Sequence, residues 1–243
     1  MSPLEAFGFT DVGRVRSRNE DSYALVENEH LAVVADGMGG HGNGDIASRI
    51  AVEAVQEKYA GARGRAGDEF AVAERLQTAF AHAHEMIRAA GEEDNSLRGM
   101  GTTLVAAVVE DRSAVIGHVG DSRAYALRGS TLTQLTEDHS WVREQIEAGH
   151  LSVDQAREHP FKSVVTRALG GENSVKVDLR RVHLQAGDIL LLCSDGLTTM
   201  LTDEEIAALL NEGGSLDERT RRLVDAANEL GGADNITVVM VTI

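Results

Sequence analysis

Residues 31–37 read LAVVADG, an apolar run of five residues that ends in an Asp-Gly pair. Similar runs end in an aspartate at residues 114–121, AVIGHVGD, and in Asp-Gly at residues 189–196, ILLLCSDG. A short apolar run bounded by turn residues predicts a strand that is buried in a sheet. A fourth aspartate, Asp234, precedes the apolar run 236–241 and opens its strand instead of closing it. The chain is therefore predicted to place aspartates at strand ends, where they converge on one rim if the strand directions agree.

An Asp-Gly pair also has an ordinary structural explanation. Aspartate caps its own turn and glycine tolerates a positive φ angle, so any one of these pairs alone is typical of a turn. The chemical explanation concerns the whole set, because several carboxylates on one rim repel one another unless a divalent cation lies between them. A site built from carboxylate oxygens selects hard ions such as Mg²⁺ or Mn²⁺. The aspartates thus favour a metal-dependent hydrolase.

Seven short motifs follow one another along the chain. They are RSRNEDS (16–22), DGMGGH (36–41), GMGTT (99–103), GHVGDSR (117–123), TEDHS (136–140), SDGL (194–197) and DNIT (234–237). In this order they resemble the motifs of the PPM family of metal-dependent protein serine/threonine phosphatases, also called protein phosphatase type 2C, in its bacterial form. Each motif alone is a weak match, whereas seven in series, from about Phe9 to the C-terminus, are specific.

The fold class follows from the pattern of elements and from the resemblance. Helices between groups of strands favour layers in which helices cover sheet faces. The resemblance implies an α+β fold, a four-layer α-β-β-α sandwich of two mainly antiparallel sheets packed face to face, and length and composition indicate a single catalytic domain over residues 1–243. We expect helices at about residues 45–59, 68–90, 141–148, 203–210 and 216–230. We expect strands at about residues 22–26, 31–35, 102–109, 114–119, 123–127, 175–184, 189–193 and 236–243.

Carried over to this sequence, the resemblance implies a core site for two Mn²⁺ or Mg²⁺ ions. Asp36 and the carbonyl group of Gly37 would bridge the two ions. Glu20 and Asp21 would serve the second ion, partly through water, because such ions keep several waters beside a few carboxylates. The full set of implied ligands is Glu20, Asp21, Asp36, Gly37, Asp195 and Asp234, of which the last two would complete the shell of the first ion.

A third, weaker ion is implied at Asp121. Together with Asp195, this residue matches the position that holds such an ion in bacterial members of the family. The alternative is structural, a Gly-Asp-Ser turn that joins two strands.

Two further residues receive catalytic roles. A water that bridges two divalent ions has a lowered pKa and attacks phosphorus in line, without a covalent phosphoenzyme. Arg16 matches the family arginine that grips the substrate phosphate, a task that suits the fixed donor fork of a guanidinium; its alternative is a solvated charge in a polar turn. Eukaryotic relatives carry a histidine directly after the Asp-Gly pair, but Met38 stands there, so His41 is the candidate general acid. A solvent-exposed loop histidine, with a metal-bound water as the acid, is the competing interpretation.

The segment of about residues 139–169 resembles the flap of bacterial relatives, a variable element thought to influence substrate choice. Trp141, the one tryptophan, lies on it. We prefer the structural interpretation of Trp141, in which an amphipathic helix anchors its ring in the core.

Composition excludes several other classes of protein. The net charge of −16 argues against nucleic acid and anionic membrane as partners, because phosphate binding needs clustered Lys and Arg. No apolar stretch approaches the length that spans a bilayer, and the N-terminus lacks the features of a signal peptide. The lone Cys193 rules out an intrachain disulfide and is expected to be a packed core thiol. We therefore expect a soluble, cytoplasmic monomer.

The implied partners are phosphorylated proteins, the substrates of serine/threonine kinases. Two alternatives keep the same fold. One is a partner-switching phosphatase that acts on an anti-sigma antagonist, and the other is a catalytically weak relative that binds phosphopeptides. The second would lack metal carboxylates, and Asp36, Asp195 and Asp234 are all present.

Overall fold

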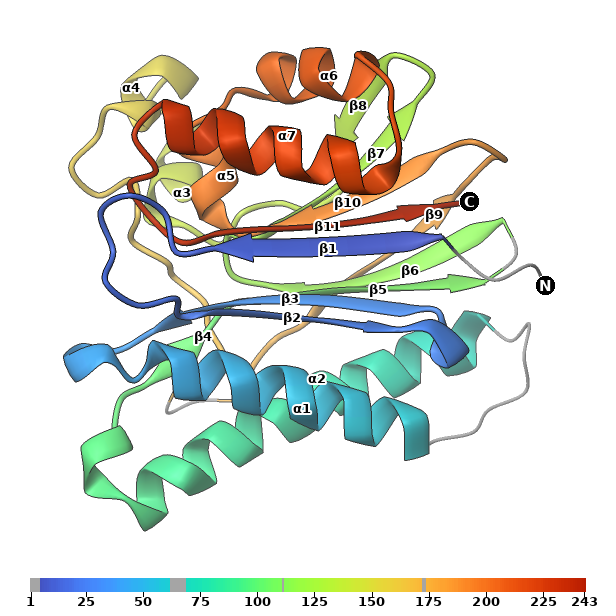
Figure 1. Cartoon of the computed structure of the whole chain (residues 1–243). Helices are drawn as coiled ribbons and strands as arrows, with labels where there is room; N and C mark the ends of the chain where they lie inside the picture. Colours follow the sequence, from blue (N-terminus) through green and yellow to red (C-terminus); the bar gives the residue numbers. More distant parts are fainter. Residues whose placement is uncertain (1–4, 62–68, 111, 172–173) are drawn as a thin grey trace.

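Two antiparallel sheets pack face to face, and helices cover both outer faces (Figure 1). The computed structural model describes residues 5–61, 69–110, 112–171 and 174–243. The first sheet has the strand order β1 (Ala6–Asp11), β11 (Ile236–Thr242), β10 (Ile189–Cys193), β7 (Arg123–Arg128) and β8 (Thr131–Gln134). The second has the order β2 (Asp21–Val26), β3 (Leu31–Met38), β5 (Leu104–Glu110), β6 (Ser113–Val119) and β9 (Asp178–His183), and β4 (Gly101–Thr102) pairs with β3. The predicted four-layer sandwich is confirmed.

The central strands of each sheet are buried on both faces, because they lie between the other sheet and a layer of helices. Alternate residues of β3 belong to different apolar layers. Leu31 and Val33 pack with α1 (Gly44–Gly61) and α2 (Glu69–Glu93), whereas Val34 packs against the other sheet. A strand with two apolar faces needs a continuous apolar run, which explains the LAVVA pattern in an antiparallel sheet.

The first sheet is covered by α5 (Asp195–Thr198), α6 (Asp203–Asn211) and α7 (Leu216–Glu229). Capping boxes fix the starts of the two longer helices. Ser215 accepts a hydrogen bond from the backbone of Glu218, whose carboxylate accepts one from the backbone of Ser215, and Thr202 caps α6 in the same way. One face of α7, with Leu223 and Ala227, packs on β1 and β11.

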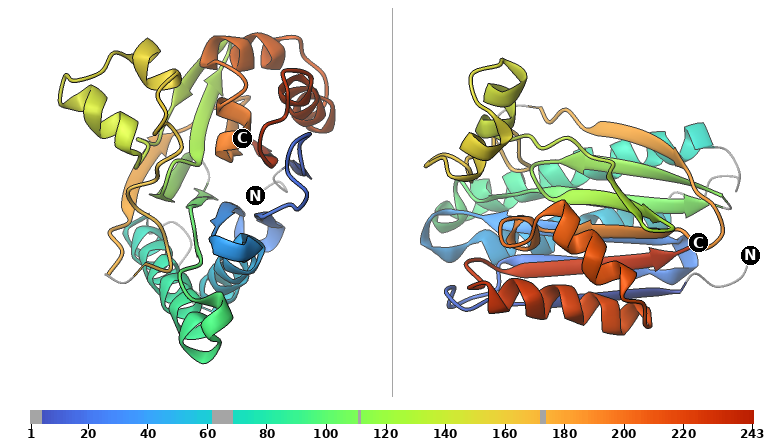
Figure 2. Two further views of the ribbon diagram at one scale, coloured as in Figure 1. Left: turned by 90° about the vertical axis from the view of Figure 1, so that its left-hand side faces the viewer. Right: turned by 90° about the horizontal axis from the view of Figure 1, so that it is seen from above.

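A smaller helical segment projects from one end of the sandwich. It contains α3 (Trp141–Glu147) and α4 (Val153–Arg157), shown in yellow-green and yellow in Figure 2. Short 3-10 turns occur at Glu27–Glu29, Gly40–Gly42 and Asn95–Leu97. None of the described helices combines the length and apolar character that a bilayer-spanning segment needs.

The structure differs from the expected elements at several places. β1 and β8 were not predicted; β1 lacks a continuous apolar run, and Gly8 within it is required because a Cβ there would lie 2.4 Å from Cε2 of Tyr23. The strand expected over 175–184 begins at Asp178, and the strand expected over 102–109 is interrupted at Thr103. The predicted helix start at residue 68 lies outside the described residues. Cys193 is fully buried, and burial raises the pKa of its thiol to about 12, so the prediction of a core thiol is confirmed.

Candidate active site

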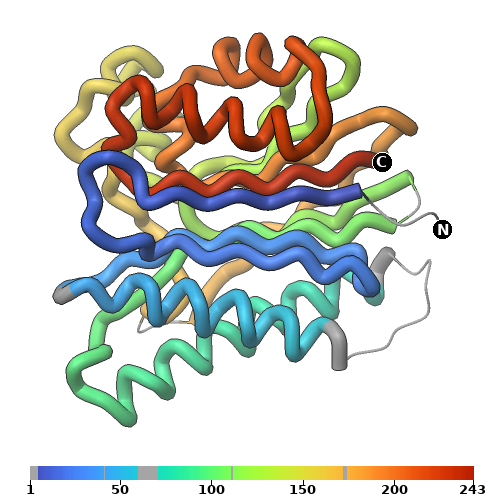
Figure 3. The backbone as a smooth tube through the Cα atoms, viewed as in Figure 1, coloured from blue at the N-terminus to red at the C-terminus, as the bar shows by residue number. Residues whose placement is uncertain are grey.

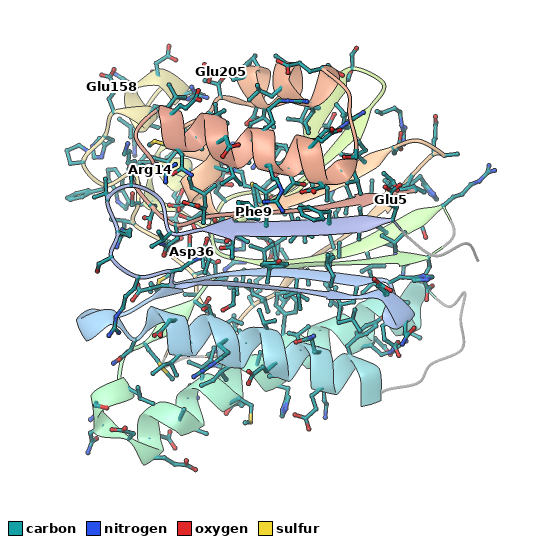
Figure 4. The ribbon with its side chains drawn as sticks, viewed as in Figure 1. Glu5, Phe9, Arg14, Asp36, Glu158 and Glu205 are labelled. Carbon is teal, nitrogen blue, oxygen red and sulfur yellow. The ribbon has the colours of Figure 1, made fainter. Side chains whose placement is uncertain are left out.

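The four aspartates singled out in the sequence lie at one edge of the sandwich. The chain crosses from one sheet to the other at this edge, in the loop between β1 and β2 (Figure 3). Because the strands are antiparallel, β3, β6 and β10 end at the edge where β2, β7 and β11 begin. Asp21 and Asp36 face each other across β2 and β3, and Figure 4 shows Asp36 between the two sheets. Strand direction therefore brings together carboxylates that are far apart in the sequence.

The carboxylates are close enough to repel one another. The pKa of Asp36 is raised well above its usual value, first by burial and then by the negative charges of Asp21, Asp195, Asp121 and Asp234. Burial and the charge of Asp234 also raise the pKa of Asp195, while its side-chain hydrogen bond with Asp36 partly opposes this. The pKa of Asp121 is likewise raised well above its usual value, by burial first and then by Asp195. This concentration of negative charge is unfavourable without a cation.

Asp21 is a buried carboxylate of the cluster that accepts hydrogen bonds from two hydroxyl groups. Its Oδ2 accepts hydrogen bonds from Ser194 Oγ at 2.7 Å and from Thr237 Oγ1 at 2.6 Å. Its Oδ1 is buried and has no hydrogen-bond partner among the described residues. Burial raises the pKa of Asp21 to about 7, although the two hydroxyl donors lower it. A buried carboxylate oxygen without a partner is costly, and a cation would satisfy it.

Asp36 and Gly37 do not form a turn, which corrects the structural explanation of this pair. Both residues belong to β3, and Gly37 pairs with Thr102 of β4. Glycine is required at position 37 for another reason, because a Cβ there would lie 2.0 Å from the carbonyl oxygen of Gly44. A Cβ on Gly44 would lie 2.6 Å from the carbonyl oxygen of Gly37 and 2.9 Å from Oε2 of Glu20. Because Gly37 and Gly44 have no side chains, the carbonyl group of Gly37 can lie near the carboxylate of Glu20.

The other aspartates occupy different local structures. Asp195 is the first residue of α5, where a carboxylate is favoured by the helix dipole. Asp121 lies between β6 and β7, as its turn interpretation requires, and its side chain also belongs to the charge cluster. Asp234 lies just before β11 and accepts a hydrogen bond from Arg16 Nη2 at 2.7 Å.

Arg16 is brought to the site by the loop between β1 and β2. Its guanidinium is about half exposed and forms an ion pair with Asp234. Partial burial lowers the pKa of Arg16, but Asp234, Glu20 and Asp36 raise it overall, so the group is firmly cationic. Arg16 is exposed, as a solvated charge would be, and its ion pair with Asp234 orients it toward the carboxylates.

Side chains that the sequence analysis did not single out hold the carboxylates in place. Asn235 donates to the backbone oxygens of Val12 and Arg18 and accepts from the backbone of Glu20, so it anchors both ends of the loop that carries Arg16. Thr103 Oγ1 accepts from the backbone of Asp36, and Thr102 Oγ1 donates to its carbonyl. Asn235, Thr102 and Thr103 all lie within the seven motifs, so membership of a motif was the sequence signal that could have identified them.

A histidine connects the flap to Asp121. His139 Nδ1 accepts from the backbone N–H of Gly120 at 3.0 Å, and the backbone N–H of His139 donates to the carbonyl of Gly120. Its Nε2 lies 3.1 Å from Asp178 Oδ2 and 2.9 Å from Arg167 Nη1. Gly120 has a φ angle of 111°, and a Cβ there would lie 2.5 Å from Cβ of Thr103. The turn before Asp121 is thus fixed from two sides.

The expected core position of Trp141 is wrong. It is partly buried but belongs to none of the apolar core clusters, and its ring contacts the rings of His159 and Phe161, at centroid distances of 4.8 and 5.3 Å. Phe161 itself is 53% exposed. The tryptophan therefore holds the flap together internally instead of anchoring it in a sheet layer. The side chain of His41, the candidate general acid, lies outside the described part of the structure, although its backbone forms the turn Gly40–Gly42.

The residues at this edge fit divalent cations by their chemistry. The donors are carboxylate and carbonyl oxygens, the like charges are mutually unfavourable, and one buried oxygen of Asp21 has no partner. Within the described ranges, no group of three or more His, Cys, Asp or Glu side chains is already placed to hold a metal ion by itself. The oxygen-rich donor set and the absence of such a group among the described residues agree if water and the Gly37 carbonyl supply much of the coordination, as Mg²⁺ and Mn²⁺ commonly require.

Comparison with known proteins identifies the family. A family model described as protein phosphatase 2C matches residues 13–234. The serine/threonine phosphatase stp of Listeria welshimeri is 42% identical over 239 residues, which cover 96% of this chain and 93% of that protein. The protein phosphatase PhpP of Streptococcus pneumoniae is 38% identical over 246 residues, covering 98% and 97%.

Solved structures agree with these relatives. The Mycobacterium tuberculosis serine/threonine phosphatase PstP/Ppp superposes with a TM-score of 0.91 at 35% identity, covering 99% of both chains. A structure of the catalytic domain of PstP in complex with two manganese ions has a TM-score of 0.88 at 35% identity, covering 99% of this chain and 98% of that one. Together with the carboxylate edge, these matches show that the chain belongs to the protein phosphatase 2C family of metal-dependent serine/threonine phosphatases.

Proposed function

We propose that the carboxylate edge is the active site, at which this chain hydrolyses phosphoserine and phosphothreonine in proteins. The observation that carries the proposal is the convergence of five aspartates, in which burial and the charges of the other four raise the pKa of Asp36. Two divalent ions, Mn²⁺ or Mg²⁺, would be held there by Glu20, Asp21, Asp36, the carbonyl of Gly37, Asp195 and Asp234. When bound, such ions lower the pKa of a shared water so that it attacks phosphorus, and they screen the phosphoryl oxygens.

The chain's own residues bind and orient the phosphoester. The guanidinium of Arg16 would leave Asp234 or share it, and would pair with two phosphoryl oxygens through its donor fork. Its loop is held by Asn235, so the cation is positioned before substrate arrives. The negative charges that raise the pKa of Arg16 include those of Asp234, Glu20 and Asp36, so the guanidinium belongs to the same electrostatic cluster as the carboxylates.

Departure of the serine or threonine oxygen requires a proton. His41 is the proposed donor, since its backbone lies four residues after Gly37 in the turn Gly40–Gly42 and histidine is the residue type most often used as a general acid at neutral pH. Asp121 is proposed to hold a third, weaker ion together with Asp195, with which it is electrostatically coupled. Phosphorylated proteins, substrates of serine/threonine kinases, are the proposed partners of a cytoplasmic monomer.

A direct assay tests the function. Purified protein is assayed with p-nitrophenyl phosphate and with a phosphothreonine peptide, with and without Mn²⁺, and again after treatment with EDTA. We expect turnover of both substrates only with the metal, and recovery when Mn²⁺ is restored. Asp36→Asn should be inactive, whereas Asp217→Asn, at an exposed position on α7, serves as the matched control and should retain activity. Metal-independent turnover, or an active Asp36→Asn protein, would overturn the proposal.

A further inference from the structure

A cleft of about 490 Å³ opens from the carboxylate edge and runs beneath the flap. Asp121 and Asp195 line it, as do residues of α3 and α4 and the segment that joins α5 to α6. Its volume lies within the range of clefts that enclose a small ligand or a short peptide segment. A polypeptide whose phosphorylated residue reaches the carboxylates would therefore have room for its neighbouring residues in this cleft.

The flap presents one sign of charge to the cleft. Its charged residues in the lining are all basic, namely Arg143, Arg157 and Lys162. Glu158 lies on the flap in Figure 4, but it is not part of the lining. The acidic residues of the flap that stay out of the described lining are Glu144, Glu147, Asp154 and Glu158. The basic residues of the flap thus lie in the cleft lining and its acidic residues outside it, although the whole chain carries a net charge of −16.

Two of the three flap cations are available to a ligand. Arg143 donates to Glu147 at 2.8 Å and is already paired. Arg157 and Lys162 are exposed and form no ion pair within the described part of the chain. A cation that faces a cleft without a partner attracts an anionic group of a ligand.

The opposite wall is not basic, because its two arginines are accompanied by three carboxylates. Arg123 Nη2 lies 2.6 Å from Asp138 Oδ2, and Arg123 Nη1 lies 3.7 Å from Asp203 Oδ1. Arg180 also lines the cleft and donates to the carbonyl of Leu135, while Glu137 lines it as an acid. Arg157 and Lys162, on the flap side, are therefore the cations of the described lining that form neither an ion pair nor a side-chain hydrogen bond.

We propose that Arg157 and Lys162 bind acidic side chains of the substrate segment next to the phosphorylated residue. The enzyme then favours phosphorylation sites flanked by Asp or Glu. Two free cations are too few to neutralise a nucleic-acid backbone, and the apolar Val142 and Ile146 in the same lining suit a polypeptide. The inference rests on the proposed function, for which it names the substrate class.

Matched peptides test the preference. Two phosphothreonine peptides are compared, one with Asp and Glu around the phosphorylated residue and one with Asn and Gln at the same positions. We expect wild-type protein to favour the acidic peptide ~3–10-fold in kcat/KM at low salt, because exposed charge pairs are individually weak and screened. Arg157→Glu with Lys162→Glu should bring the ratio to about one or below, and Arg157→Gln with Lys162→Gln should give an intermediate ratio. Arg49→Glu with Lys58→Glu, on the exposed face of α1, is the matched control and should keep the wild-type ratio.

The possible outcomes distinguish the proposed preference for acidic peptides from the phosphatase function itself. Equal hydrolysis of the two peptides by wild type, or a preference that survives the double reversal, overturns the inference and leaves the phosphatase function intact. Failure of wild type to hydrolyse either peptide with Mn²⁺ would overturn both. If the reversed protein does not fold, inhibition of wild type by unphosphorylated peptides answers the question, because the acidic peptide should inhibit more strongly than the neutral one and lose that advantage in high salt.

Discussion

Arg16 Nη2 lies 2.7 Å from Asp234 Oδ2, so a cation from the β1–β2 loop and a carboxylate from the start of β11 form an ion pair across the active-site edge. The pair joins two residues separated by 218 positions. It holds the guanidinium over the carboxylate cluster, where a phosphoester would replace or share its partner. Substrate binding and metal binding are therefore expected to be linked through Asp234.

Replacing Arg16 tests its role toward the phosphate. Arg16→Ala should lower kcat/KM by the equivalent of ~2–4 kcal/mol, because a charge-assisted bidentate contact is lost. Arg16→Lys should recover only part of the loss, since an ammonium group lacks the donor fork. Arg14→Ala is the matched control, because Arg14 is exposed and pairs only loosely with Asp11, at 3.8 Å. Steady-state kinetics with a phosphothreonine peptide checks this, and an unchanged kcat/KM for Arg16→Ala would show an ordinary surface residue.

Replacing Asp36 or Asp195 separates activity from stability. Either change to Asn should reduce turnover well beyond the ~10–100-fold loss that follows removal of groups that only support metal ligands. In metal-free protein the same variants should unfold at a higher temperature than wild type, because like-charge repulsion at the edge is relieved. Activity assays with Mn²⁺ and thermal unfolding in EDTA measure the two effects. Loss of stability together with activity would instead indicate a structural role.

Asp121→Ala tests the third ion. It should leave the core site occupied but lower turnover, with a larger loss on phosphopeptides than on p-nitrophenyl phosphate, whose good leaving group needs little acid assistance. Isothermal titration with Mn²⁺ should show the two tighter sites retained. Equal losses on both substrates would argue against a leaving-group role, and a collapse of thermal stability would support a purely structural turn between β6 and β7.

Asp21 predicts a pH dependence of stability in metal-free protein. Burial raises its pKa from 3.8 to about 7. Between about pH 4 and pH 7 the folded protein keeps a proton that the unfolded chain has released, so the free energy of unfolding falls as the pH rises through this window. The effect is at most about 4 kcal/mol, because each pKa unit corresponds to about 1.4 kcal/mol.

Asp21→Asn isolates this contribution. The variant replaces the protonated acid with a neutral group of the same shape, so its stability relative to wild type should increase from pH 4 to pH 7 in EDTA. Thermal unfolding of both proteins across this range provides the measurement. A constant difference between them would show that Asp21 titrates normally and that its environment is more polar than the buried, partnerless Oδ1 indicates.

Several strands, two helix starts and the carboxylates of the site could be predicted from the sequence, because each depends on residues that are close together in the chain. The apolar runs at 31–35 and 189–193 predicted buried strands, and their lack of alternation followed from sheets that are covered on both faces. The capping residues Thr202 and Ser215 stand where the predicted helices begin. The motif series also pointed to the carboxylates, and those side chains do converge at one edge.

Long-range contacts decided the rest. Asp36-Gly37 resembles a turn in sequence, yet β4 pairs with it and extends the strand. β1 has little apolar signal of its own and exists because β11 supplies its hydrogen-bond partners. Trp141 contacts aromatic rings of the flap and not residues of the core. A strand partner, a hydrogen bond between the side chains of Asp36 and Asp195, or a cleft lined from both the flap and the sheet depends on residues distant in the chain, and no window of sequence contains both sides of such a contact.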